Sequence, residues 1–560
     1  MSFILRCLDC GHKAPYHPMS YVCPKCDSGW RYAEYDLDTI AKTLPVQLGK
    51  RPFGLWRYRE LLPVRNPNPA IALGEGGTPL IQASNLGMML GCPNIFIKDE
   101  RQGPTASFKD RQAAVSIAAL KEAGITEMVV ASTGNVAIAY SAYAARAGIK
   151  LWAFVTSLVP AVKMREIGLY GSQVVKVTGS YDEVKRAAAE FATQRNLYRN
   201  QGARSAPAVE SMKTIAYEIS EQITAYFGQP EQKNGEKQAL WRTPDWYIQA
   251  VSGGMGPVGV AKGFDELKQM GFINKKPAIV CIQAAGCAPM ANSWKKGLSV
   301  AEPVKEPRTH IETLATGDPG RLYPILREIV DETGGAFESV TDEEAFRAMH
   351  VIAKMEGISA EPASAVAFAG LFKLIRAGVI KQDDTVVVNC TGHTMPPEKF
   401  VLGDNWTRNV ILPEKKPKEK ETPKEGVLAA LSHVVPERFP RIVIVDDTTE
   451  ARLLIRRILQ SQGDFTLFEA TNGKEALRTI RREKPDLIIL DLMMPELDGF
   501  GVLDELKADS ETASIPVIVS TAKELTGEER EKLKGQIQSL LQKGDFMSDE
   551  FLDEVHTVIR

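Results

Sequence analysis

The chain has 560 residues, of which 44% are hydrophobic and 25% are charged, and its formal net charge is −2. This length exceeds the roughly 250–300 residues at which one hydrophobic core stops growing, so several domains are expected. The near-neutral charge excludes recruitment of nucleic acid or anionic lipid by a global field. No apolar run approaches the ~18 residues of a membrane span, and no cleavage region of a signal peptide follows the start. We therefore expect a cytoplasmic protein.

Four of the eight cysteines form two Cys-x-x-Cys pairs near the N-terminus: Cys7, Cys10, Cys23 and Cys26. This spacing suits tetrahedral zinc, because each pair closes a tight turn and four thiolates complete the coordination shell. A closed shell indicates a structural role and not a catalytic one. The alternative is a site of unligated thiols that has lost its metal. We predict a zinc ribbon over residues 1–45.

The rest of the chain is expected to form two α/β domains joined by a linker. In residues 46–410, short β-branched runs alternate with Ala-rich helical stretches, which predicts a buried, mostly parallel sheet. Residues 411–437 are rich in Pro, Lys and Glu and predict a solvated linker. Residues 438–560 contain five strand-like runs separated by helices, which indicates a small doubly wound domain.

One lysine of the larger domain occupies an electrostatically unfavourable place. Lys109 lies in the turn SFKDR that opens a predicted helix, and a helix N-terminus favours anions. Such an unfavourable position is typical of a functional residue, although a solvated surface lysine is the simpler alternative. Two small-residue turns follow, ASTGN at 131–135 and SGGMG at 252–256. Their free N–H groups and glycines allow close approach of an anion such as a phosphate.

Five motifs, in this order, resemble those of fold-type II pyridoxal-phosphate enzymes, most closely threonine synthase. They are GEGGTPL at 74–80, PTASFKDR at 104–111, ASTGN at 131–135, AEPASA at 360–365 and CTGH at 390–393. The resemblance implies a two-lobed fold similar to tryptophan synthase β, a small amino-acid substrate and a homodimer. It also implies a carbon–oxygen lyase that converts O-phosphohomoserine and water into threonine and phosphate. Some threonine synthases carry an N-terminal cysteine ribbon.

The resemblance also implies roles for individual residues. Lys109 would hold pyridoxal 5'-phosphate as a Schiff base, Asn135 would bind the ring hydroxyl, and Thr391 would face the pyridine nitrogen. A hydroxyl at that nitrogen suits elimination and replacement better than transamination. The cofactor phosphate would be held by Ser252, Gly253, Gly254, Met255 and Gly256. The substrate would be bound by Ser132, Thr133, Lys163 and Arg165.

Departures from the family pattern bear on the substrate. Ala208 stands where threonine synthases have an arginine for the substrate phosphate, and SGGMG is closer to the loop of serine/threonine dehydratases. Losing a bidentate guanidinium weakens dianion binding, and Lys163, Arg165 or Arg204 are the candidate replacements. One alternative is a dehydratase or a β-replacement enzyme on a phosphoserine-like substrate. Another is a signalling protein whose large domain senses an amino acid without turning it over.

Polar side chains end four predicted strands of the C-terminal domain, and such strand ends converge on one crevice. Asp446, Asp447 and Asp491 would repel one another unless a hard cation such as magnesium joins them. Thr521 and Lys543 would complement a phosphoryl group. Acids that merely terminate strands are the alternative explanation, but they do not predict all five positions.

This pattern resembles the response-regulator receiver domain. The resemblance implies that Asp491 is the phosphoacceptor, that all three aspartates bind magnesium and that Thr521 is the switch hydroxyl. It also implies that Lys543 contacts the phosphoryl group. A histidine kinase or a phosphotransfer protein would be the partner. Leu540 replaces a residue that is commonly aromatic in receivers, and Gly544 replaces a common proline, so the route from the site to the surface is expected to differ.

Overall fold

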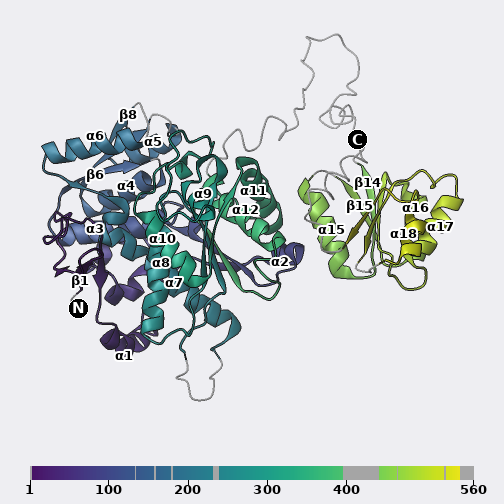
Figure 1. Ribbon diagram of the computed structural model, residues 1–560, viewed down its shortest axis with the longest axis horizontal. Coiled ribbons are helices and arrows are strands. Elements are labelled where there is room, and N and C mark those ends of the chain that lie inside the picture. The colour runs from purple at the N-terminus through teal and green to yellow at the C-terminus, as the bar shows by residue number, and fades with distance from the viewer. Residues whose placement is uncertain are drawn as a thin grey trace, which may run out of the picture. The chain divides into compact units, whose positions relative to one another are not determined.

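The computed structural model describes residues 3–132, 134–156, 159, 161–177, 181–230, 239–394, 440–462, 465–521 and 525–542. The chain divides into two compact units (Figure 1). The first contains most of residues 1–395, and the second contains residues 396–560 together with the short segments 84–93 and 354–357. The predicted linker at 411–437 lies outside the described residues, so its conformation stays a prediction.

The N-terminal residues form a small antiparallel sheet in the order β2-β1-β3. Its strands are β1 (Ile4–Cys7), β2 (Lys13–Ala14) and β3 (Arg31–Glu34). Cys7 pairs with Arg31 and Leu5 with Ala33 across β1 and β3. Helix α1 (Leu37–Leu48) follows and runs across the boundary expected at residue 45, with Asp36 accepting a hydrogen bond at its N-cap.

The smaller lobe is a four-stranded parallel sheet in the order β8-β7-β6-β9. Its strands are β6 (Glu127–Ser132), β7 (Lys150–Thr156), β8 (Gln173–Val177) and β9 (Tyr198–Arg199). Its helices are α3 (Lys109–Glu122), α4 (Asn135–Ala147), α5 (Ala161–Leu169) and α6 (Tyr181–Gln194). Strand β6 is mostly buried because helices cover both faces of a parallel sheet.

The larger lobe is a six-stranded sheet in the order β12-β11-β10-β13-β5-β4, in which β4 alone is antiparallel to its neighbour. Its strands are β4 (Leu80–Gln82), β5 (Ile95–Asp99), β10 (Trp246–Ala250), β11 (Ala278–Ala284), β12 (Ala336–Val340) and β13 (Val386–Cys390). The helices along this stretch of the chain are α2 (Ser84–Leu90), α7 (Ala206–Phe227), α8 (Met255–Gln269), α9 (Pro289–Lys295), α10 (Leu322–Thr333), α11 (Asp342–Glu356) and α12 (Pro362–Arg376).

Helices α7 and α8 pack closely because glycines of α8 face the backbone of α7. A Cβ at Gly259 would lie 2.4 Å from the carbonyl oxygen of Val209, and one at Gly263 would lie 2.8 Å from that of Lys213. No larger residue fits at either position without moving a helix. This contact fixes the N-terminus of α8, which follows the SGGMG turn.

The second unit contains a parallel sheet in the order β15-β14-β16-β17-β18. Its strands are β14 (Arg441–Val445), β15 (Thr466–Ala470), β16 (Leu487–Leu490), β17 (Val517–Thr521) and β18 (Ser539–Gln542), and its helices are α15 (Thr449–Gln462), α16 (Gly473–Glu483), α17 (Gly499–Ala508) and α18 (Gly527–Leu533). This strand order is that of a flavodoxin-like doubly wound domain. The predicted α/β fold class is confirmed.

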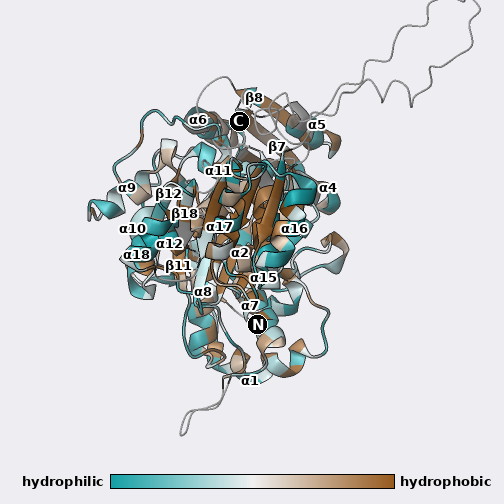
Figure 2. Cartoon of the chain, turned by 90° about the vertical axis from the view of Figure 1, so that its right-hand side faces the viewer, coloured by the Kyte–Doolittle hydropathy of each residue, from teal (hydrophilic) through white to brown (hydrophobic). Residues whose placement is uncertain are grey.

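The hydropathy of the chain follows this layering. The strands are mostly apolar, whereas the helices at the periphery carry polar residues (Figure 2). Within the described segments, no helix combines the length and the apolar character that a bilayer span requires.

Candidate functional site

The C-terminal ends of three neighbouring strands bring the predicted cofactor residues to one edge of the larger sheet. Strands β10, β13 and β5 are parallel and adjacent. The SGGMG turn follows β10, Thr391 follows β13, and the segment after β5 leads to Lys109. The N–H of Phe108 donates to the carbonyl oxygen of Thr391 at 3.0 Å, so the backbone before Lys109 is joined directly to the CTGH turn.

Lys109 is half-buried at the first position of α3. Burial lowers the pKa of Lys109 to about 8, although the carboxylate of Glu361 partly opposes this change. Its Nζ lies 3.9 Å from the centre of the Phe108 ring, and it makes no hydrogen bond or ion pair within the described part of the chain. An amine that is partly neutral near pH 8 can act as a nucleophile toward a carbonyl group.

The side-chain amide of Asn135 is held in one orientation by two charged neighbours. Its Nδ2 donates to Oε1 and Oε2 of Glu361 at 3.1 and 2.9 Å, and its Oδ1 accepts from Nζ of Lys163 at 3.0 Å. An ammonium group only donates and a carboxylate only accepts, so the amide cannot be turned around without losing both contacts. Asn135 therefore presents its N–H groups toward Glu361 of the other lobe.

Glu361 is a site residue that the sequence analysis did not single out. It is the N-cap of α12 and lies in the AEPASA motif, immediately before Pro362. Its N–H donates to the carbonyl oxygen of Gly392 at 3.0 Å, which ties it to the CTGH turn. The signal that would have found it is a carboxylate inside a motif already assigned to the family.

The hydroxyl of Thr391 is paired with a second buried hydroxyl. Its Oγ1 lies 2.8 Å from Oγ of Ser364, and this Oγ also accepts from the N–H of Gly392 at 2.8 Å. Ser364 was likewise not predicted. Because a hydroxyl can donate or accept, Thr391 can meet a ring nitrogen without carrying a charge.

The SGGMG turn has the geometry of an anion cradle. Gly254 has φ +88°, and a Cβ there would lie 2.3 Å from Cδ1 of Leu326, whereas a Cβ at Gly256 would lie 2.4 Å from Nε2 of Gln249. Helix α8 begins at Met255 without a side-chain cap, so its first N–H groups remain available to a ligand. The Oγ of Ser252 lies 2.5 Å from Oγ1 of Thr316. Thr316 was not among the residues predicted from the sequence.

The ASTGN turn is held by its own serine. Oγ of Ser132 accepts from the N–H groups of Gly134 and Ala137, both at 3.0 Å. This hydroxyl therefore shapes the N-terminus of α4, which is a different role from the substrate contact expected of Ser132. Thr133 lies outside the described residues.

The candidate replacements for the missing arginine are not equivalent. Lys163 reaches Asn135, as described above, whereas Arg165 is exposed on α5 and makes no hydrogen bond or ion pair among the described residues. Arg204 is also exposed and lies beside Gly29 of the N-terminal sheet. Ala208 itself is fully buried in the first turn of α7. Of the three cations, only Lys163 is placed at a predicted cofactor residue.

A buried charge cluster that the sequence analysis missed anchors the helix of Lys109. Arg111 donates to Glu100 from Nε and Nη2, at 2.8 Å each, and to Glu218 from Nη1 and Nη2 at 2.6 and 2.7 Å. Lys98 also donates to Glu218, at 2.7 Å. All four side chains are buried. The cluster joins β5, α3 and α7.

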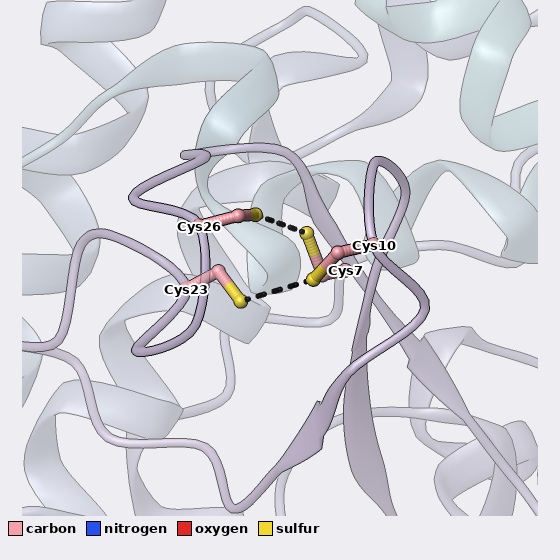
Figure 3. Close-up of side chains that lie close together, drawn as sticks. All are labelled: Cys7, Cys10, Cys23 and Cys26. Atoms are coloured by element: carbon pink, nitrogen blue, oxygen red, sulfur yellow. Dashed lines mark hydrogen bonds between the residues drawn. The ribbon is translucent and has the colours of Figure 1, made fainter.

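The four N-terminal cysteines converge on one point (Figure 3). Sγ of Cys7 lies 3.5 Å from Sγ of Cys26, and Sγ of Cys10 lies 3.7 Å from Sγ of Cys23. A tetrahedral shell with Zn–S distances of about 2.3 Å requires sulfur–sulfur distances of about 3.8 Å. Burial raises the pKa of Cys7, but hydrogen bonds from the backbone of Cys10 and Asp9 and from the thiols of Cys26 and Cys10 together lower it to about 6. This donor set fits zinc.

In the second unit, three carboxylates lie together at the ends of β14 and β16. Oxygens of Asp446, Asp447 and Asp491 lie within 4.8 Å of one another. Asp446 and Asp491 are buried, and Asp447 is exposed. Thr521 ends the neighbouring strand β17, whereas Lys543 lies outside the described residues. Oxygen donors of this kind suit magnesium.

Comparisons with known proteins identify the families of the two α/β domains. The model of the pyridoxal-phosphate dependent enzyme family matches residues 71–392, and that of the response regulator receiver domain matches residues 442–555. The chain belongs to the pyridoxal-phosphate dependent enzyme family and carries a C-terminal receiver domain. The resemblance inferred from the motifs is confirmed at this level.

Within that family, curated threonine synthases are close relatives. The threonine synthase of Methanocaldococcus jannaschii is 33% identical over 390 residues, which cover 69% of this chain and 91% of the relative. That of Methanosarcina acetivorans is 32% identical over 404 residues, which cover 71% and 93%. A solved structure of threonine deaminase isoform 2 from Solanum lycopersicum is 19% identical, with a TM-score of 0.49, and covers 65% of this chain and 92% of that chain.

Proposed function

We propose that residues 46–410 form a threonine synthase that converts O-phosphohomoserine and water into threonine and phosphate. The observation that carries this proposal is the position of Lys109, which is half-buried with its pKa lowered to about 8 and follows Phe108, whose N–H donates to Thr391 of the other lobe. The threonine synthase relatives support the choice of reaction. We place this enzyme in the cytoplasm as a homodimer.

The residues present fit pyridoxal 5'-phosphate. Lys109 would bind its aldehyde carbon and Asn135 its ring oxygen, while Thr391 would face its ring nitrogen. The turn from Ser252 to Gly256 would hold the phosphate, since Gly254 and Gly256 leave no room for a Cβ. When bound, this cofactor supplies an electron sink for carbanion chemistry.

The chain's own groups then divide the remaining tasks. Lys109, with its pKa near 8, can accept and return a proton at Nζ close to neutral pH. The hydroxyl pair of Thr391 and Ser364 presents no fixed charge to the ring nitrogen. The N-terminus of α4, shaped by Ser132, and the ammonium group of Lys163 provide an anion site for the substrate. Thr133 and Arg165 stay candidates for the same site.

A second candidate function is a dehydratase or a β-replacement enzyme. The observation that favours it is Ala208, which is fully buried where the relatives' substrate arginine is expected. Turnover of O-phosphohomoserine and of threonine by the purified protein separates the two reactions. Threonine formation supports the synthase, and release of a keto acid from threonine supports the dehydratase. Cofactor binding without either reaction supports an amino-acid sensor.

We propose that the four cysteines bind one structural zinc ion. The convergence of the sulfurs at distances near those of a tetrahedral shell supports this assignment. The metal content of the purified protein tests it, with Cys7→Ser and Cys10→Ser as variants that should lose the ion.

We propose that residues 438–560 are phosphorylated on Asp491 with magnesium bound by Asp446, Asp447 and Asp491. Thr521 and Lys543 would contact the phosphoryl group, and a histidine kinase or a phosphotransfer protein would supply it. Residues 411–437 would link this domain to the enzyme. Acetyl phosphate with magnesium should label the wild type and not Asp491→Asn. A change of several-fold in kcat/KM on labelling would assign the receiver to regulation of the enzyme, and equal kinetics would assign it to docking of an outside partner.

A further inference from the structure

The cysteine ribbon contacts the helix that supports the cofactor-phosphate turn. We propose that the ribbon positions this turn through an ion pair between Asp9 and Arg321, so that Arg321 is a positioning residue for cofactor binding. The inference rests on the proposed function, because it assumes that the SGGMG turn holds a phosphate.

The ribbon is anchored to the catalytic core through buried polar contacts. The N–H of Ala33 donates to Oε1 of Glu210 at 2.9 Å, and Nζ of Lys262 donates to the carbonyl oxygen of Ala33 at 2.5 Å. The hydroxyl of Tyr35 donates to Oε2 of Glu210 at 3.2 Å. Glu210 belongs to α7 and Lys262 to α8. Because both backbone groups of Ala33 are used, the β3 strand is fixed against the two helices.

The metal site itself makes a second contact with the catalytic core. Asp9 lies between the predicted zinc ligands Cys7 and Cys10 and forms an ion pair with Arg321. The guanidinium of Arg321 also lies 5.9 Å from the centre of the Trp30 ring. A zinc-closed turn would therefore present Asp9 in a fixed place.

Arg321 immediately precedes the residues that support the phosphate turn. It is the N-cap of α10, and Leu322 and Leu326 lie in the first two turns of that helix. A Cβ at Gly253 would meet Cδ1 of Leu322 at 3.8 Å, and one at Gly254 would meet Cδ1 of Leu326 at 2.3 Å. Displacing the start of α10 would therefore move the side chains that hold the turn in place.

The expected effect of breaking this ion pair is small, because its two side chains are 35% and 38% exposed. Exposed ion pairs contribute little to stability. We expect the loss of this pair to raise the dissociation constant of pyridoxal phosphate by about two- to five-fold. Removal of zinc should have a larger effect, because it releases the whole cysteine turn and not one pair alone.

The test measures the Kd of pyridoxal phosphate for cofactor-free full-length protein, together with its zinc content. Arg321→Gln and Asp9→Asn should each raise the Kd by about two- to five-fold, and the double variant should raise it no further, since both changes remove the same contact. Zinc should stay bound in Arg321→Gln. Arg327→Gln is the matched control, since Arg327 lies in the same helix and its one ion pair among the described residues is with Asp331 of that helix.

The inference would be overturned by an unchanged Kd in Arg321→Gln, by an equal change in Arg327→Gln, or by additive effects in the double variant. Removing zinc from the wild type with a chelator should raise the Kd by more than Arg321→Gln does, and an unchanged Kd without zinc would also contradict it. Wild-type protein that binds no pyridoxal phosphate would refute the proposed function itself, which distinguishes that failure from a failure of the ribbon contact alone.

Discussion

At the scale of single residues, the site depends on the charge of Lys109 and on the backbone of the SGGMG turn. Lys109 has its pKa lowered to about 8 by burial, and Glu361 acts in the opposite direction. Because the folded-state pKa lies below that of the unfolded chain, the unfolded state binds more protons between these two values. This group therefore makes the protein more stable as pH rises through about 8 toward the unfolded pKa of lysine.

Replacing Glu361 by glutamine should lower the pKa of Lys109 further, by about one pH unit, because a nearby negative charge favours the ammonium form. The pH dependence of acylation of Lys109 in cofactor-free protein measures this value directly by peptide mapping. Glu306→Gln removes a carboxylate that is 81% exposed and should leave the pKa near 8. If Glu361→Gln raised the pKa or left it unchanged, Glu361 would have no electrostatic role at this amine.

Alanine at Gly254 should weaken binding of pyridoxal phosphate by about ten-fold or more, since its φ of +88° is costly for any other residue and the new Cβ would meet Leu326. The adjacent Gly253→Ala is the control, because its Cβ would make an ordinary contact of 3.8 Å with Leu322. Cofactor titration of both variants tests the difference. Equal affinities would mean that the turn does not hold the cofactor phosphate.

At the scale of elements, the lysine helix α3 is fixed from within the core by a cluster of charges. Arg111 lies two residues after Lys109 and contacts Glu100 before α3 and Glu218 in α7. Removing one partner of a buried ion pair leaves the other charge without compensation. We therefore expect the position of Lys109 to depend on the buried contacts of Arg111.

Arg111→Met should lower the free energy of unfolding by about 3–5 kcal/mol, the usual cost of leaving buried carboxylates unpaired. Urea denaturation of the cofactor-free protein measures this loss. Arg59→Met is the comparison, because Arg59 is 52% exposed and its pair with Glu60 spans 3.7 Å, so a change below about 1 kcal/mol is expected. A similar small change in Arg111→Met would show that the buried cluster is not needed for stability.

The sequence predicted the parts of the site that follow from strand order. Lys109, Thr391 and the SGGMG turn all follow strands, and parallel neighbours bring their ends together. Asp446 and Asp491 were found in the same way. Glu361 and Ser364 were missed because no local pattern shows which distant segment a helix start will face. The sequence did not reveal that the hydroxyl of Ser132 accepts from the N–H groups of Gly134 and Ala137, and its predicted contact with the substrate stays a prediction.

At the scale of the whole molecule, one chain joins a pyridoxal-phosphate dependent enzyme to a response regulator receiver domain. In the six-stranded sheet and in the five-stranded sheet, the predicted site residues follow the C-terminal ends of parallel strands, which is why motif order alone indicated two separate sites. The boundary expected at residue 45 falls inside α1, because that helix begins at Leu37 and continues past residue 45. Helix α1 packs on the core of the larger lobe. The amino-acid composition around residue 45 did not indicate that one helix crosses this boundary.

The central claim is that Lys109 carries the cofactor, and reduction of the loaded protein with borohydride tests it most directly. The reagent fixes pyridoxal phosphate covalently to the amine that holds it, and peptide mapping then identifies that residue. We predict one modified lysine, Lys109, and no modification in Lys109→Ala. Modification of another lysine, such as Lys163, or of none in protein that has bound the cofactor would contradict the account.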